Sequence, residues 1–166
     1  MQPNSTDSHF MELALQQARL APPIGEVPIG AVLVSDNRVI AAAHNYREIS
    51  QDPTAHAEII IIRKAAEQLK TWRLTNTTLY VTLEPCPMCA GAIVQARITR
   101  LVFGAWDPKA GACGSILDIP SEPRFNHRVQ VTGGLCKEES RELLQEFFRT
   151  KRGTASNQHR PSKSVP

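Results

Sequence analysis

Two cysteines, Cys86 and Cys89, stand three residues apart where the sequence predicts the start of a helix. On the first turn of a helix, side chains at positions i and i+3 point the same way, so the two thiols can chelate one ion. The positive end of the helix dipole stabilises a thiolate, which is the form that binds zinc. A redox dithiol or a pair of structural thiols has the same spacing, so the pair favours a metal site without excluding either alternative.

A metal site at this pair needs a further ligand. A structural zinc site normally closes with four protein ligands, whereas the other two cysteines, Cys113 and Cys136, are isolated in the sequence. We expect His56 to be the third ligand, because it stands at the predicted start of another helix, after a break in the chain at Pro53. The other histidines compete for this role: His9, His44, His127 and His159.

Glu58 follows His56 by two residues and turns the expected metal site into a candidate catalytic site. Three protein ligands leave the fourth position of zinc open to water, whose pKa then falls to about 7. A carboxylate that stands beside a ligand without being one can accept a proton from that water and pass it on. Glu58 could also simply be an acidic residue favoured at a helix N-terminus, and the two roles are compatible.

The composition is that of an ordinary globular protein. The 166 residues suffice for one domain, and 42% of them are hydrophobic while 21% are charged. No apolar run approaches the roughly 20 residues that span a bilayer. The polar N-terminus lacks the layout of a signal peptide, so we expect no membrane association and a cytoplasmic location. The net charge of +3 is too small to indicate a nucleic-acid partner by itself.

Alternating strands and helices predict the fold class. An amphipathic helix is expected over residues 10–21, and a hairpin over 29–34 and 39–43. A loop covers 45–53, Thr54 is the expected N-cap of a helix that reaches Leu69, and further helices are expected over 88–96 and 138–149. Strands are expected over 78–83, 99–105 and 128–132. This order indicates an α/β domain in which helices cover both faces of one mixed sheet.

The C-terminus differs in composition from the rest of the chain. Residues 153–166 are rich in Ser, Pro and basic residues, so we expect a single domain over 1–152 followed by a disordered basic tail. From Arg149 onward the chain carries five basic residues and no acidic one. Such a segment can contact phosphates, although basic tails without a specific partner are common.

Taken together, the candidate residues match a known signature. His-x-Glu followed by Pro-Cys-x-x-Cys is characteristic of zinc-dependent nucleobase deaminases. The flanking segments narrow this match, because from roughly Phe10 to Arg152 the chain resembles the bacterial tRNA-specific adenosine deaminase family. The resemblance rests on residues 52–58, 82–92, 102–105, 126–129 and 147–149.

The resemblance implies a three-layer α/β/α cytidine deaminase-like fold with a five-stranded mixed sheet. It also implies a homodimeric enzyme that converts adenosine to inosine at the wobble position of a tRNA anticodon loop. Each subunit would hold one Zn²⁺ through His56, Cys86 and Cys89, and Glu58 would carry protons. The base and the anticodon loop would contact residues at matching positions: Asn45, Val27, Pro28, Asp107, Phe148 and Arg149.

Two other functions stay open on the residues alone. A deaminase of a free base or nucleotide, such as guanine, cytosine or deoxycytidylate, would use the same scaffold; the flanking segments argue against it. A nucleic-acid-binding module with a structural zinc would need no turnover, and Glu58 beside only three ligands argues against that.

Trp106, in a loop that varies within the family, could stack on a base or pack at a dimer interface.

Overall fold

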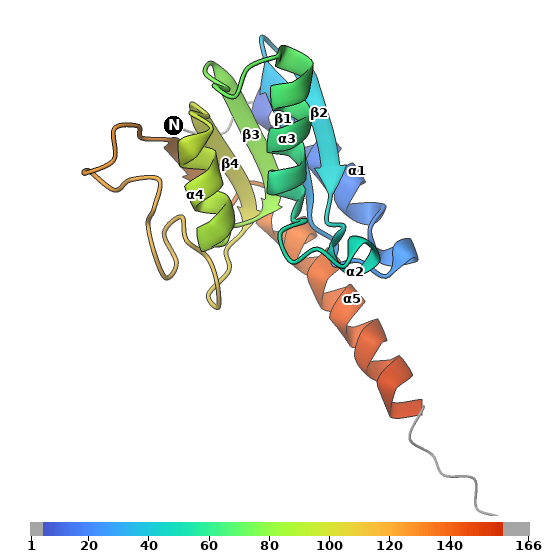
Figure 1. The fold of residues 1–166 in the computed structure, drawn as a ribbon. Coiled ribbons are helices and arrows are strands. Elements are labelled where there is room, and N and C mark those ends of the chain that lie inside the picture. The colour runs from blue at the N-terminus through green and yellow to red at the C-terminus, as the bar shows by residue number, and fades with distance from the viewer. Residues whose placement is uncertain (1–4, 158–166) are drawn as a thin grey trace, which may run out of the picture.

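The fold is built on one five-stranded sheet with the strand order β2-β1-β3-β4-β5 (Figure 1). The computed structural model describes residues 5–157, and the side chains of 5–153. The strands are β1 Gly30–Ser35, β2 Arg38–His44, β3 Thr77–Leu83, β4 Arg100–Ala105 and β5 Gln130–Gly133. The helices are α1 Ser5–Arg19, η1 Pro22–Ile24, α2 Arg47–Ser50, α3 Ala57–Leu69, α4 Pro87–Gln95 and α5 Lys137–Asn157.

The sheet is mixed, as the sequence predicts. β1 pairs antiparallel with both β2 and β3, whereas β3, β4 and β5 run parallel to one another. The predicted hairpin is confirmed: β1 and β2 are joined at Asp36 and Asn37, whose φ angles of 48° and 59° are left-handed. Asn and Asp tolerate this conformation well, and two such residues in succession match the right-handed twist of a hairpin.

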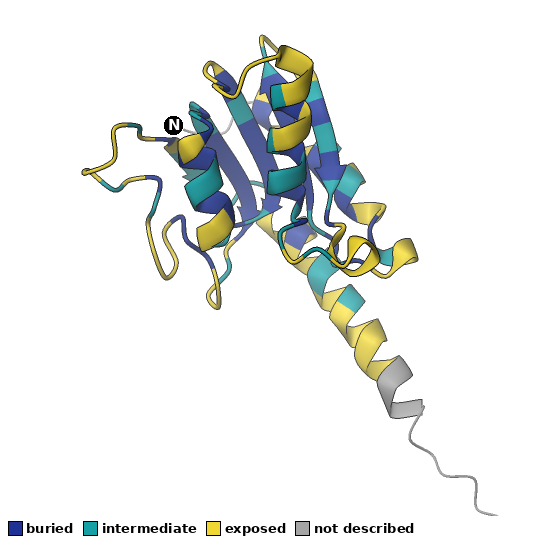
Figure 2. Ribbon diagram, viewed as in Figure 1, coloured by how far each residue is buried: buried dark blue, intermediate teal, exposed yellow. Residues whose placement is uncertain are grey.

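Helices cover both faces of the sheet, which confirms the predicted three-layer arrangement. α3 and α4 lie side by side on one face, and α1 and α5 lie on the other (Figure 1). Side chains along each strand alternate between the two layers, so that Leu33 and Leu79 pack toward α3 and α4 while Val32 and Tyr80 pack toward α1. The central strands are buried on both faces as a result (Figure 2).

The start of α3 and the start of α4 lie at the same edge of the sheet (Figure 1). α4 begins directly after the C-terminal end of β3, and α3 leads back to the beginning of β3 through a turn at residues 70–76. The residues predicted for the metal site, which stand at these two helix starts, are therefore neighbours in space.

The structure differs from several local predictions, and the first helix, expected over 10–21, spans Ser5–Arg19. Thr54 does not cap α3, because its amide and hydroxyl groups donate to Asp52 Oδ1 and the helix begins at Ala57 with His56 at the N-cap. The expected loop over 45–53 contains the short helix α2. The last helix runs on to Asn157, eight residues beyond the expected end at Arg149, so it includes the first part of the predicted tail. The rest of that tail, 158–166, lies outside the described residues.

No helix in the described part of the chain is both long and apolar enough to cross a membrane.

A buried ion pair attaches α1 to the sheet. Arg100 donates two hydrogen bonds to Asp7, of 2.7 Å to Oδ1 and 2.9 Å to Oδ2, and the Tyr80 hydroxyl donates a third to Oδ1 at 2.8 Å. The side chain of Asp7 is 4% exposed and that of Arg100 is 16% exposed. The charge of Asp7 is therefore compensated inside the protein and not by water.

We expect Arg100→Met to lower the free energy of unfolding by about 3 kcal/mol, because it removes the charge that compensates the buried Asp7 carboxylate. Urea denaturation measures this change. The control is Arg19→Met, since the Arg19 side chain that pairs with Glu12 is 46% exposed; its loss should change stability by less than about 1 kcal/mol. Equal effects of the two substitutions would contradict the assignment.

Candidate metal centre

His56 occupies the N-cap position of α3. Its backbone is extended, with φ −74° and ψ 152°, and its carbonyl accepts the first helical hydrogen bond, from Ile60 N at 3.0 Å. The side chain caps no helix amide, which leaves the imidazole free for another partner. The amide of Ala57 is satisfied instead by Asn45 Oδ1 at 2.9 Å. Asn45 thus takes over the capping role that His56 does not fill.

Cys86 stands at the equivalent position of α4. It has an extended backbone, with φ −72° and ψ 172°, and Pro87 follows it on the first helical turn. Proline fits there because the amide that it lacks would have no partner inside the helix. Cys89 lies one turn further on and is fully buried, whereas Cys86 is half-buried. All four cysteines of the chain are free thiols.

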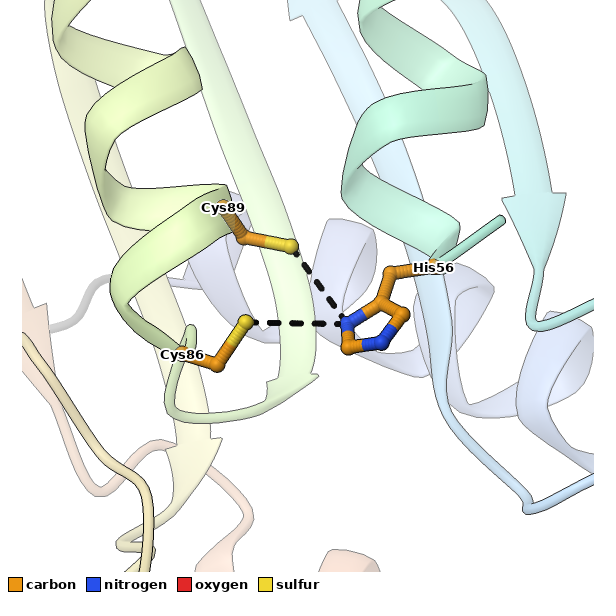
Figure 3. A group of neighbouring side chains, drawn as sticks. All are labelled: His56, Cys86 and Cys89. Carbon is orange, nitrogen blue, oxygen red and sulfur yellow. Dashed lines mark hydrogen bonds between the residues drawn. The ribbon is translucent and has the colours of Figure 1, made fainter. Parts of the chain in front are cut away.

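The side chains of His56, Cys86 and Cys89 converge between the two helices (Figure 3). His56 Nδ1 lies 3.5 Å from Cys89 Sγ and 3.7 Å from Cys86 Sγ. A tetrahedral zinc ion, with bonds of about 2.3 Å to sulfur and about 2.0 Å to nitrogen, would hold its ligand atoms roughly 3.5–3.8 Å apart. One imidazole and two thiolates therefore fit zinc in both donor type and spacing.

The cluster favours a thiolate at Cys86. A hydrogen bond from the Cys89 thiol, assisted by His56, lowers the pKa of Cys86 to about 4. The same bond raises the pKa of Cys89, which keeps its proton, and the hydrogen bond with Cys86 raises the pKa of His56. One sulfur is thus already in the form that binds zinc at neutral pH.

Glu58 lies on the first turn of α3, beside the cluster, and is 4% exposed. Burial raises the pKa of its carboxyl group to about 6. Its Oε2 atom is buried without a hydrogen-bond partner, which is uncommon for a carboxylate inside a protein. An unpartnered carboxylate oxygen next to two thiols and an imidazole is suited to hold or release a proton for a bound molecule.

The other histidines within the described residues are absent from the cluster, which comprises His56, Cys86 and Cys89. His44 Nδ1 contacts the carbonyl of Asn45 at 2.8 Å, and His127 Nε2 contacts the carbonyl of Ile98 at 2.7 Å. His9 packs edge-on against Phe10. The fourth competitor, His159, lies outside the described part of the chain.

The segment of Val27 and Pro28 lies beside Asn45. The backbone amide of Asn45 donates to the carbonyl of Ile29, the residue after Pro28, at 3.0 Å. Asn45 and Pro28 are buried, and Val27 is half-buried. The preceding residue, Glu26, is 1% exposed, and its carboxylate accepts hydrogen bonds from the amides of Arg47 and Ile49 at the start of α2. Three predicted residues thus lie close together, and one of them, Asn45, contacts the start of α3; their contact with a substrate stays a prediction.

Residues 84–86, which join β3 to α4, are called the metal-binding turn below. The loop that carries Asp107 lies against this turn, since Ala112 N donates to the carbonyl of Pro85 at 2.9 Å. Asp107 is half-buried, and its Oδ1 accepts the amides of Lys109 and Ala110. In the same loop Trp106 is 49% exposed, and its ring packs edge-on against Phe103 of its own chain.

Phe148 and Arg149 lie on the exposed surface of α5. The ring of Phe148 contacts that of its neighbour Phe147. This ring contact is within α5, so a role for Phe148 and Arg149 at the site stays a prediction.

Two buried acidic residues near the site escaped the sequence analysis, namely Glu26 and Glu84. Glu84 is 2% exposed and immediately precedes Pro85. Burial by itself would raise the pKa of Glu84, but hydrogen bonds from Ser115, Asp107 and Cys113 hold it below its ordinary value. In the sequence, Glu84 is a single acidic residue at the end of an apolar strand, and this pattern is equally typical of an exposed strand end.

Known deaminases resemble this chain over most of its length. The family model of MafB19-like deaminases matches residues 5–152. A tRNA-specific adenosine deaminase from Bacillus subtilis is 51% identical over 143 residues, which cover 86% of this chain and 89% of the relative. A tRNA-specific adenosine deaminase from Agrobacterium fabrum is 55% identical over 145 residues, which cover 87% of this chain and 95% of the relative.

Solved structures show the same fold. One from a study of A-to-I editing by tRNA:A34 deaminases superimposes with a TM-score of 0.80 at 55% identity, covering 82% of this chain and 99% of the other. A guanine deaminase from Nitrosomonas europaea superimposes with a TM-score of 0.71 at 26% identity, covering 84% and 83%. The chain is thus far more similar in sequence to the former than to the deaminase of a free base.

We expect Cys86→Ala to lose most of the bound zinc, because it removes one of the three ligand atoms and the thiolate. Inductively coupled plasma mass spectrometry of the purified protein measures the zinc content. Cys136→Ala is the matched control, since Cys136 is half-buried outside the cluster. Zinc content that is unchanged by Cys86→Ala would rule out Cys86 as a ligand.

Proposed function

Since the chain belongs to the MafB19-like deaminase family and groups with tRNA-specific adenosine deaminases, we propose that it hydrolyses the adenosine at the first anticodon position of a tRNA to inosine. The observation that carries this proposal is the buried Glu58 carboxylate beside a His-Cys-Cys cluster that fits zinc. Such a pairing serves hydrolysis, whereas a purely structural zinc site needs no unpartnered carboxylate.

His56, Cys86 and Cys89 would hold the zinc ion, one in each chain. When bound, zinc supplies Lewis acidity that makes water a nucleophile near neutral pH. Three protein ligands are the number found in catalytic zinc sites, which keep a position open. The N-termini of α3 and α4 both point at the site, so their dipoles stabilise the two negatively charged thiolates of the loaded protein.

Glu58 would move the protons of the reaction. Hydrolysis adds the oxygen of water to C6 of the purine and releases the amino group as ammonia. Glu58 Oε2 takes up a proton from water and gives it to the purine ring, and a second proton reaches the leaving amino group by the same route. A carboxyl group with a pKa of about 6 can both accept and donate a proton at neutral pH.

Asn45 would orient the purine. Its Oδ1 atom is bound by the amide of Ala57, which fixes the side-chain amide and leaves Nδ2 as a donor for the base. Val27 and Pro28, which share a wall with Asn45, and Asp107, on the loop next to Cys86, would form the sides of the cleft. Preset side chains of this kind lower the entropy lost when the substrate binds.

A tRNA anticodon loop suits a site at the start of two helices. A base inside a duplex is stacked and out of reach, whereas a loop can present an unstacked base at little energetic cost. Phe148 would stack on a base, and Arg149 would contact phosphate from the exposed part of α5. We also place the enzyme in the cytoplasm, where mature tRNAs are used.

The experiment that tests this function is an assay of the purified protein on an anticodon stem-loop with adenosine at position 34. Free adenosine, guanine and cytosine are each tested as alternative substrates in separate reactions. We expect inosine in the stem-loop and little turnover of the free compounds. Turnover of a free base alone would favour the rival function, and zinc-loaded protein without any turnover would favour a binding module.

We expect Glu58→Gln to keep zinc and to lose at least about 100-fold in the rate of inosine formation, because the amide fills the same space without transferring protons. Single-turnover kinetics on the stem-loop, together with zinc analysis, measure both properties. Glu67→Gln is the control, since Glu67 is exposed on the same helix. Substantial activity in Glu58→Gln would end the proton-carrier assignment.

We further propose that the enzyme is a homodimer. The segment between β4 and β5 exposes a groove whose apolar residues are Leu117, Ile119 and Phe125, with Leu117 49% and Phe125 44% exposed. Asp118, Glu122 and Arg124 border the same groove. Apolar surface with charges of both signs at its rim is typical of an interface between copies of one chain.

We expect Leu117→Asp to convert the dimer into a monomer, because it introduces a charge into the apolar groove. Size-exclusion chromatography with light scattering gives the mass, which should fall from that of two chains to the 18.3 kDa of one. Trp72→Asp is the control, since Trp72 is similarly exposed outside the groove. A wild-type protein with the mass of one chain would contradict the proposal.

A further inference from the structure

The buried carboxylate of Glu84 receives hydrogen bonds from three separate points of one loop. Its Oε1 accepts the amides of Cys113 at 3.0 Å and Ser115 at 2.9 Å, and its Oε2 accepts the amide of Asp107 at 2.9 Å. The Ser115 hydroxyl donates a further hydrogen bond to Oε2. Four donors thus converge on two oxygen atoms, from residues that are 23 to 31 positions away in the chain.

The loop is shaped to fit around this carboxylate. A Cβ atom added to Gly111 would lie 2.2 Å from Glu84 Oε2 and 2.3 Å from its Cδ, so no other residue fits at this position without displacing the carboxylate or the loop. The amide of Gly111 is bound by the carbonyl of Asp107 at 2.8 Å, which closes the turn. Residues 107–115 therefore wrap the carboxylate, as backbone amides do around a bound anion.

Glu84 stands at the junction of this loop with the metal-binding turn. Its own amide donates to Ala105 O at 2.8 Å, just before the loop, and its neighbour Pro85 accepts the amide of Ala112. The backbone then continues directly to Cys86. The Glu84 side chain therefore makes several of the hydrogen bonds that hold the loop against the turn, although it is not a member of the metal cluster.

We propose that Glu84 is a positioning residue, which fixes loop 107–115 against the metal-binding turn and so presets the wall of the cleft that receives the anticodon loop. This inference rests on the proposed function. Glu84 lies outside the cluster of His56, Cys86 and Cys89, and it acts through the backbone amides of Asp107, Cys113 and Ser115. Its loss should therefore impair RNA binding more than the chemical step.

Glu84→Gln tests the proposal with little change in size. The amide keeps one acceptor oxygen and replaces the other by an NH₂ group, which opposes the donors that converge there. We expect KM for the stem-loop with adenosine at position 34 to rise about tenfold or more, because buried donors lose their acceptor. The value of kcat should stay within about threefold and zinc should be retained, because the catalytic groups are untouched.

Three further variants make the result specific. Glu84→Asp keeps a carboxylate and should recover part of the affinity. Glu12→Gln is the control, since the Glu12 carboxylate is bound by Arg19 at the surface and its loss should leave KM unchanged. Gly111→Ala should raise KM like Glu84→Gln, because its methyl group would lie 2.2 Å from Glu84 Oε2 and 2.5 Å from the carbonyl oxygen of Asp107, so that the loop could not keep its place around the carboxylate.

Hydrogen exchange of the loop provides a readout that does not depend on activity. We expect the amides of Asp107, Cys113 and Ser115 to exchange much faster in Glu84→Gln than in the wild type. If the wild type leaves the stem-loop unchanged, the proposed function fails while the exchange still decides whether Glu84 holds the loop. Unchanged exchange would overturn the proposal, as would zinc loss or a fall in kcat at an unchanged KM.

Discussion

Three ligand atoms from two distant segments lie within 4.8 Å of one another because α3 and α4 begin side by side at one end of the sheet. Each helix is fixed there by its buried face, through Ile61 and Ala65 of α3 and through Ala90 and Ile93 of α4. The extended backbone of His56 and of Cys86 at the two N-caps turns both side chains inward. The geometry of the metal site is therefore a property of the hydrophobic core beneath it, and a small shift of either helix would separate the ligands.

Four acidic side chains are buried in the described part of the chain, and their partners distinguish structural from chemical roles. Asp7 is paired with Arg100, whereas Glu26 accepts backbone amides of α2 and Glu84 accepts those of loop 107–115. Each of these three carboxylates stabilises a connection between segments. Glu58 alone of the four retains a buried oxygen without a partner. A group that must accept and release protons cannot be fully satisfied in the resting protein, so this local cost is a requirement of the reaction.

The sequence allowed the elements and the cluster of His56, Cys86 and Cys89 to be predicted because their signals are local. Apolar periodicity identified the sheet and its helices, and the breaks before His56 and Cys86 identified the helix starts. The N-cap at Thr54 was wrong because Asp52 binds Thr54 in a turn, a competition between two short polar residues that propensities do not resolve. α2 is too short to show periodicity, and Gly153 hid the continuation of α5. The roles of Glu26 and Glu84 depend on segments more than 20 residues away, so no local pattern could reveal them.

In the proposed enzyme, three side chains of the protein hold zinc and a fourth position is left for the reaction. X-ray absorption spectroscopy at the zinc edge of the wild-type protein measures the ligand set directly. We predict two sulfur atoms at about 2.3 Å and one imidazole nitrogen at about 2.0 Å, with a light oxygen scatterer completing the shell. A third sulfur atom, which only Cys113 or Cys136 could provide, or a second imidazole would contradict this account, because either would close the site to water.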